Sequence, residues 1–459
     1  MEPEHIQHLY WRAGFGILPK PLKALKKKSR KAVVNALFQN SEAYGALQID
    51  TSAIDSILES QGMLSDEERK KIQAYSRKKL MELNGAWINR LGTSEAILRE
   101  KMTLFWANIF VCKDNNVVYM QNYNNTLREH ALGDFRAFVN AISKEAAMTK
   151  YLNTKQNKKQ KPNENFAREL MELFTLGEGH YTEEDIKESA RAFTGYAHNL
   201  KGDFVLRKFQ HDHGLKTFFG KTGNFSGEDI VDIILEKKQC ALFISKKIYK
   251  YFVNDSINDS HVNAMADVFY KDYNIAKLMH FVFSSDWFYH KGNIGTKIKS
   301  PIEFLVGMKQ LVPIKFDNPR QLINLQRQLG QILLDPPNVA GWKGGRNWID
   351  SNTIALRLKL PSMLLNDAYI SKAETGEEDT MMSVKKEIYR KNFGKRLKTS
   401  SDWSTFTKNF DSVATNDLHD YILAGNLSPD TKKYLDRLEK ISKKAYSIQL
   451  MSLPEYQMC

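Results

Sequence analysis

The chain has 459 residues, of which 42% are hydrophobic and 26% charged, the composition of a globular protein with ample core. No stretch approaches the roughly 18 apolar residues of a membrane span, and the first residues lack the basic and apolar regions of a secretory signal. We therefore expect a cytoplasmic protein without a transmembrane segment.

The formal net charge of +14 favours anionic partners. The basic residues lie in scattered clusters, however, and none shows the aromatic interleaving of a groove for single-stranded nucleic acid. Solvated faces of a lysine-rich protein are the simpler interpretation, so nucleic acid is not expected as a partner; if it did bind, retention on DNA would depend strongly on salt. Cys112, Cys240 and Cys459 form no close pair, which excludes a disulfide scaffold and Cys-x-x-Cys zinc sites.

Helical patterns dominate from the N-terminus onward. Thr93 opens a run to Cys112 whose apolar residues recur at three- and four-residue spacing. Pro162 starts a helix that Gly177 stops, and Thr182 and Ser226 begin further helices with capping-box patterns. Other helices are expected at 21–38, 64–92, 124–150, 240–253, 260–283, 300–312, 319–333 and 353–369. The predicted fold is mainly α.

The segment 203–221 is the exception. Apolar residues alternate around Phe204 and Phe209, His213-Gly214 forms a turn, and Thr217 to Phe219 alternates again, which predicts a β-hairpin. The polar stretch 371–380 is the best linker candidate. We therefore expect a helical core domain over 1–370 with a small hairpin insertion, a linker at 371–380 and a helical C-terminal extension over 381–459.

Carboxylates and an arginine repeat at helical spacing in the helix that begins at Pro162. Glu164, Arg168 and Glu172 lie four residues apart on one stripe, and Glu169 and Glu172 are three apart. Two converging carboxylates can hold a divalent cation, or share a proton so that one becomes a general acid. No Glu-x-x-His accompanies them, which argues against a di-iron site. The alternative is an ion network in which Arg168 bridges Glu164 and Glu172.

A second constellation lies at the tip of the predicted hairpin. His211 beside Asp212 can act as a general base, and Lys216 can hold an anionic group. The same residues, with Gly214, also suit an ordinary turn.

Two loops complete the set. Asp335 to Trp342, followed by Trp348, is rich in proline, glycine and tryptophan, which suits either core packing or a ligand-facing wall. Near the N-terminus, Arg12 precedes Gly14-Phe15-Gly16 and can pair with a carboxylate or a bound anion. With no strand before it and no third glycine, this is not a dinucleotide fingerprint.

Together these blocks resemble the bacterial family catalogued as domain of unknown function 1800, and the resemblance spans most of the chain. The family has no established activity, and its genes often lie beside those of proteins similar to the alkaline phosphatase and sulfatase superfamily, which implies a working partner. The residues that carry the resemblance are His8-Leu9 with Arg12 to Gly16, Trp106 with Asn108 and Phe110, Pro162 to Gly177, Tyr181 to Glu183, Ala190 to Gly195, His211-Asp212 with Gly214 and Lys216 to Phe218, and Asp335 to Trp342 with Trp348.

One departure bears on function. The family commonly shows Trp-His-Asn-His-Phe where this chain has Trp106-Ala107-Asn108-Ile109-Phe110. If those histidines bind metal or transfer protons elsewhere in the family, this chain lacks both, and we expect no metal site of that type.

Two functional hypotheses follow. The first is a polar cleft formed by the 163–177 helix, the 203–216 hairpin and the Arg12 loop, acting by hydrolase-like acid/base chemistry on an anionic or carbohydrate-like group. Its catalytic groups would be Glu169, Glu172, His211 and Asp212, and its anion-binding groups Arg12, Arg168 and Lys216. The second is a non-catalytic assembly partner of a phosphatase- or sulfatase-superfamily protein. The sequence identifies no cofactor, substrate or oligomeric state.

Overall fold

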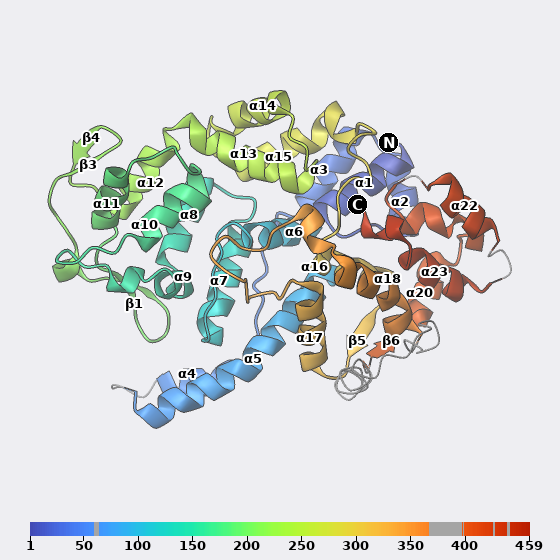
Figure 1. Cartoon of the computed structure of the whole chain (residues 1–459), viewed down its shortest axis with the longest axis horizontal. Helices are drawn as coiled ribbons and strands as arrows, with labels where there is room; N and C mark the ends of the chain where they lie inside the picture. The colour runs from blue at the N-terminus through green and yellow to red at the C-terminus, as the bar shows by residue number, and fades with distance from the viewer. Residues whose placement is uncertain (59–63, 367–396, 398, 426, 438–440) are drawn as a thin grey trace, which may run out of the picture.

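The computed structural model describes residues 1–58, 64–366, 397, 399–425, 427–437 and 441–459. Helices make up most of this part of the chain (Figure 1), so the mainly α prediction is confirmed. Within the described residues no helix is both long enough and apolar enough to cross a membrane.

The elements follow one another in three stretches. The first contains α1 (Pro3–Ala13), α2 (Pro19–Lys26), α3 (Arg30–Asn40), α4 (Ser52–Leu58), α5 (Asp66–Thr93), α6 (Ile97–Trp106), α7 (Val117–Glu129), α8 (Phe135–Lys144), α9 (Ala146–Tyr151) and the 3₁₀ turn η1 (Thr154–Gln156). The second contains α10 (Asn165–Glu169), the π-helix η2 (Leu170–Thr175), α11 (Glu183–Ala192), β1 (Tyr196–His198), β2 (Phe204–Leu206), η3 (Lys208–Gln210), β3 (Lys216–Phe218), β4 (Lys221–Gly223), α12 (Gly227–Leu235), α13 (Lys238–Phe252), α14 (Asp259–Phe269), α15 (Ile275–Ser284) and η4 (Asp286–Tyr289). The third contains α16 (Pro301–Leu311), β5 (Ile314–Phe316), α17 (Pro319–Leu329), η5 (Gly345–Trp348), α18 (Ser351–Leu365), β6 (Thr399–Ser401), α20 (Trp403–Phe410), η6 (Thr415–Leu418), α21 (His419–Ile422), α22 (Pro429–Asp436), α23 (Lys443–Met451) and η7 (Pro454–Gln457).

Capping boxes begin α11 and α12 where the sequence predicts them. The Thr182 hydroxyl accepts a hydrogen bond from Asp185 N at 3.1 Å, and the Asp185 carboxylate accepts one from Thr182 N at 2.9 Å. Ser226 and Asp229 repeat the arrangement at α12. Each box satisfies backbone donors that the first turn of a helix leaves without partners.

The predicted helix 21–38 is α2 and α3, and two longer predicted helices are also broken into shorter ones. The predicted helix 124–150 is α7, α8 and α9, and the predicted helix 260–283 is α14 and α15. Asp134 and Asn274 cap the new helices by accepting hydrogen bonds from Ala137 N and Lys277 N. The apolar periodicity runs through both breaks, because the separate helices pack on the same core, and only the capping residues mark the boundary.

Small β-hairpins occur where the sequence predicts one, but the strands pair differently. The predicted hairpin joins 204–209 to 217–219, whereas β2 pairs with β1 and β3 pairs with β4. Phe219 and Gly220 have φ values of 48° and 79°, so both central residues of the β3–β4 turn are left-handed. A turn of that kind matches the twist of a two-residue hairpin, and it closes β3 onto β4 instead of β2.

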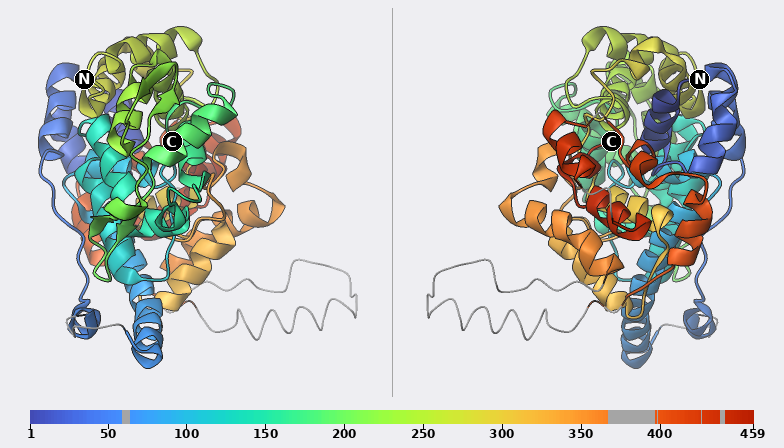
Figure 2. Two further views of the ribbon diagram at one scale, coloured as in Figure 1. Left: turned by 90° about the vertical axis from the view of Figure 1, so that its left-hand side faces the viewer. Right: turned by 90° about the vertical axis from the view of Figure 1, so that its right-hand side faces the viewer.

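Buried apolar side chains form two clusters. The larger one includes Trp87, Phe110 and Phe135, and the second joins Trp11 and Phe304 to the C-terminal elements. β5 also pairs with β6 across the gap in the described chain, and α20 contacts α2. Figures 1 and 2 show the C-terminal elements beside α1 and α2. The predicted linker 371–380 lies outside the described residues, and the division into a core domain and an extension stays a prediction.

Candidate functional site

The predicted carboxylate helix is an α-helix that widens into a π-helix. α10 ends at Glu169, and beyond it Leu176 N and Gly177 N donate to Met171 O at 2.8 and 3.0 Å. The Thr175 hydroxyl donates to Leu170 O at 2.5 Å. A π-helix has more residues per turn than an α-helix, and such turns are frequent at functional sites. The three-residue spacing of Glu169 and Glu172 therefore does not stack their side chains as on an α-helix.

Glu169 is the least constrained of the predicted catalytic carboxylates. Its side chain is partly buried and makes no hydrogen bond or ion pair with another described residue. Burial raises the pKa of the Glu169 carboxyl, the negative charge of Glu172 raises it further, and Arg168 opposes both. Glu169 also contributes to the raised pKa of Tyr151 in α9, after burial and Cys112, which places the two side chains within electrostatic reach. A partly exposed carboxyl of this kind can take up and release a proton.

Glu172 has a different partner. Tyr181, in the loop before α11, donates its hydroxyl hydrogen bond to Glu172 Oε2 at 2.7 Å. Burial and this hydrogen bond raise the pKa of the Tyr181 hydroxyl. Glu169, Glu172 and Tyr181, which we call the carboxylate group, thus lie together at the junction of α10 and the π-helix.

Arg168 ties α10 to α11. It forms an ion pair with Glu164 at 3.2 Å and a bidentate pair with Glu183 of α11, with N···O distances of 2.9 and 2.8 Å. The expected bridge to Glu164 is present, but the second partner is Glu183 rather than Glu172. The hydrogen bonds that Arg168 donates to Glu183 and Glu164 raise the pKa of its guanidinium, and those to Glu183 contribute most. Its charge is therefore shared with two carboxylates at the surface.

His211 and Asp212 are held by the loop in which they lie. His211 Nδ1 donates to Thr194 O at 2.8 Å, and burial lowers the pKa of its ring. The Asp212 carboxylate accepts from Arg191 Nε and from Gly214 N, each at 2.8 Å. Burial alone would raise the pKa of Asp212, but these two hydrogen bonds outweigh it and hold the pKa below its usual value. Both side chains fix the connection between α11 and β3.

Lys216 is fully buried in the same loop. Its ammonium donates to Asp212 O at 2.7 Å and to Gly214 O at 3.0 Å, and burial lowers its pKa. Backbone carbonyls occupy the donors that would hold an anion. The charge of Lys216 therefore stabilises the turn.

Arg12 lies in a separate part of the fold. It is 2% exposed, and its Nη2 donates to Asn293 O at 2.7 Å. Burial lowers the pKa of the guanidinium, while charges at Cys459, Glu303 and Asp255 oppose that change. α1 and α10 lie on different sides of the molecule (Figure 1), so the structure does not bring Arg12 to the carboxylate group.

A cavity of about 460 Å³ lies elsewhere, between α5, the start of α7 and the β1–β2 turn. Its lining includes Arg69, Lys70, Tyr119 and Lys150. None of the seven predicted site residues lines it. Lys150 is paired with Asp114 at 2.7 Å, so part of the basic character of the cavity is neutralised.

The chain matches the family described as "Protein of unknown function (DUF1800)" over residues 8–458. The chain belongs to the DUF1800 family. No curated protein and no solved structure matches it.

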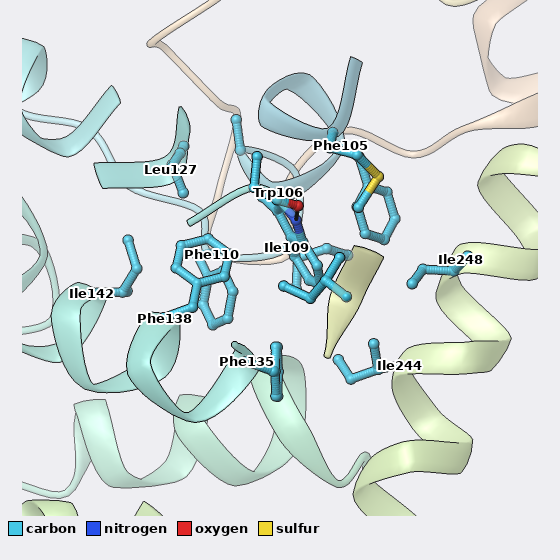
Figure 3. Packing of buried hydrophobic residues seen from close by; sticks show 14 of the residues in the cluster. Phe105, Trp106, Ile109, Phe110, Leu127, Phe135, Phe138, Ile142, Ile244 and Ile248 are labelled. Carbon is cyan, nitrogen blue, oxygen red and sulfur yellow. Dashed lines mark hydrogen bonds between the residues drawn. The ribbon is translucent and has the colours of Figure 1, made fainter. Parts of the chain in front are cut away.

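In this DUF1800 protein Ala107 and Ile109 belong to the apolar core. Ala107 is 7% exposed and Ile109 is 6% exposed. Figure 3 shows Ile109 among aromatic side chains and the isoleucines of α13. Asn108 lies between them, and its amide accepts from Trp342 N at 2.7 Å and donates to Trp342 O at 3.1 Å. This part of the segment therefore anchors the 335–342 loop. No group of three or more histidine, cysteine or carboxylate side chains in the described ranges is placed to hold a metal ion.

Sequence reasoning missed a buried charge cluster in the DUF1800 fold. Lys101 of α6 is 2% exposed and pairs with Glu303 of α16. Lys299 is fully buried between the rings of Trp11 and Tyr456, 3.6 and 3.8 Å from their centroids, and burial lowers its pKa to about 7. The only local signal was the capping-box pattern from Ser300 to Glu303, since neither a lysine within a helix, such as Lys101, nor one before a helix, such as Lys299, shows in the sequence that it is buried.

Proposed function

We propose that the carboxylate group is an acid/base site for an anionic or carbohydrate-like substrate, with Glu169 as the proton-transfer residue. The observation that carries the proposal is the state of Glu169: a partly exposed carboxyl with a raised pKa and no partner of its own. Carboxyls with raised pKa values are typical general acids, because they keep a proton near the pH at which the enzyme works.

The neighbouring residues support the same role. Glu172 is held by Tyr181 and supplies the negative charge that keeps Glu169 protonated to higher pH. His211, Asp212, Lys216 and Arg12 are engaged in internal contacts, so the proposal concentrates the chemistry on the carboxylate group. Arg168 is the one predicted anion-binding residue that borders it.

A panel of nitrophenyl phosphate, sulfate and glycosides tests the proposal. We expect turnover of at least one of these by the unaltered chain and a loss of about 100-fold or more in Glu169→Gln, as for removal of a general acid or base. Glu164→Gln is the matched control, since Glu164 lies in the same segment but pairs with Arg168 at the surface. Equal rates for the two variants, or no turnover by the unaltered chain, would count against the site.

The second candidate function is assembly with a phosphatase- or sulfatase-superfamily protein. Asp212 and Lys216 are engaged in internal contacts, Arg12 donates through Nη2 to Asn293 O, and Ile109 fills a core position, so these four residues contribute to the fold. Purification from the native host with a tagged chain tests this candidate. A stoichiometric partner of that superfamily that Glu169→Gln leaves bound would favour assembly; purification of the chain alone would count against it.

A further inference from the structure

An exposed aromatic side chain lies beside a group of lysines at one end of the molecule. Phe209, in the 3₁₀ turn η3, is 92% exposed, and Leu215 in the same loop is 68% exposed. Both lie in the segment between β2 and β3, and Figure 1 shows β3 and β4 at the end opposite the C-terminal elements. Covering such a ring with a partner removes its apolar surface from water, which is favourable.

The cations come from two segments that are bonded to each other. Lys159 N donates to Gln210 O at 2.9 Å, and Gly195 joins the same segments because its N donates to Asn157 O and its O accepts from Arg207 N. Arg207 is also close enough to Lys155 to help lower its pKa, after burial. The two backbone segments that carry the lysines and Phe209 are therefore held side by side. We call the following residues of these segments the basic tip: Lys155, Lys158, Lys159, Lys161, Arg207, Lys208 and Phe209.

The charge of the basic tip is not neutralised locally. Residues 155–161 and 204–211 contain no Asp or Glu. None of the six basic side chains forms an ion pair within the described part of the chain, and Lys158, Lys159, Lys161, Arg207 and Lys208 are exposed. Elsewhere some surface lysines are paired, for example Lys221 with Glu236 and Lys277 with Asp272, and others, such as Lys20 and Lys27, form no ion pair with a described residue. The surface is thus complementary to a dense negative charge.

We propose that the basic tip binds the surface of an anionic lipid membrane. The exposed phenyl ring of Phe209 enters the boundary between headgroups and acyl chains, while the lysines and arginine contact the phosphate and carboxylate headgroups. This combination of an apolar tip with surrounding cations is the usual recognition of anionic bilayers by peripheral proteins. A nucleic-acid groove would instead interleave several aromatic rings with the cations, and the tip carries one.

Sedimentation of the full-length chain with vesicles tests the proposal. We expect the chain to bind vesicles of phosphatidylcholine with about 30% phosphatidylserine at about 0.1 M salt and not vesicles of phosphatidylcholine alone. Lys158→Glu with Lys159→Glu, and separately Phe209→Ser, should each lower the partition coefficient about tenfold or more. All three positions are exposed, so the variants should fold normally.

Matched controls lie on α22 at the other end of the molecule. Lys432→Glu with Lys433→Glu makes the same charge change on exposed lysines, and Tyr434→Ser removes a ring that is 41% exposed. We expect both to leave binding unchanged. The proposal is overturned if the unaltered chain binds neither kind of vesicle or binds both equally. It is also overturned if the control variants lose as much vesicle binding as the tip variants, or if Phe209→Ser binds vesicles as well as the unaltered chain. A different outcome would assign the cations to nucleic acid. In that case the unaltered chain would not bind vesicles, and Phe209→Ser would still be retained on a DNA oligonucleotide.

Discussion

Glu169 links its own protonation to the stability of the fold. Its pKa is higher in the folded chain than in the unfolded chain, so its contribution to stability is fully present below the unfolded pKa and is lost as pH rises through the folded pKa. Glu169→Gln should therefore melt above the unaltered chain at pH 8 and together with it at pH 4. Thermal melts at both pH values check this. Glu164→Gln, which removes a surface pair, should show no such gain; a gain of equal size would contradict the assignment.

The buried pair of Lys101 and Glu303 should affect stability in the opposite direction, because its contribution is lost as the pH falls. The pKa of Glu303 is lowered to about 2, because Lys101 and the backbone of Ser300 outweigh the effect of burial. The pair therefore stabilises the fold above the unfolded pKa, and that contribution is lost as pH falls toward 2. Lys101→Met should cost about 3–5 kcal/mol at pH 7 in urea unfolding, because it leaves Glu303 buried and unpaired. Lys101→Met with Glu303→Gln should recover part of that loss, and no recovery would contradict the pairing.

At the scale of elements, the 335–342 loop depends on a glycine next to Asn108. Gly341 has a φ of 76°, and a Cβ there would lie 2.3 Å from Asn108 Oδ1. Gly341→Ala should therefore cost about 3 kcal/mol or more, through both backbone strain and a steric clash. Gly330→Ala is the matched control, since its φ is 90° and a Cβ meets nothing within 4 Å, and strain alone costs about 1–2 kcal/mol. Equal losses in urea unfolding would show that Asn108 moves aside.

Capping chemistry and periodicity were enough to predict most helices, because both act within one turn. Thr182 and Ser226 begin their helices through residues three positions away, so the signal is entirely local. The π turn between Glu169 and Gly177 gave no such signal, and neither did the choice of β1 as the partner of β2. Both depend on packing against segments distant in sequence.

For the candidate site, too, the sequence predicted what depends on local spacing and missed what depends on contacts between distant segments. The spacing of Glu169 and Glu172 along the chain identified the segment that carries the carboxylate group, but neither the π-helix nor the contact with Tyr181. The roles of Arg12 and Lys216 do not, because a charged side chain in a sequence shows neither its burial nor the carbonyls around it. In the structure, the Asn293 carbonyl accepts from Nη2 of Arg12, and the Asp212 carbonyl accepts from the ammonium of Lys216.

At the scale of the whole molecule, the second core cluster joins the two ends of the described chain. Trp11 and Phe304 pack in the same cluster as Phe410 and Tyr456, and Lys299 lies between the rings of Trp11 and Tyr456. Arg357 adds hydrogen bonds to Gln457 Oε1 at 2.8 Å and to Lys299 O at 2.7 Å. A large shared apolar surface couples the stabilities of the parts that it joins.

This coupling predicts a single unfolding transition for the full chain. Phe410 is fully buried, so Phe410→Ala should cost about 3–5 kcal/mol and shift the one calorimetric transition to lower temperature. Amide hydrogen exchange in α1 and α16 should accelerate together with exchange in α20, because the same opening exposes all three. Tyr434→Ala, at an exposed ring of α22, should change stability by less than about 0.5 kcal/mol. A second transition at lower temperature in Phe410→Ala, with α1 still protected, would instead establish an independent C-terminal extension after residue 370.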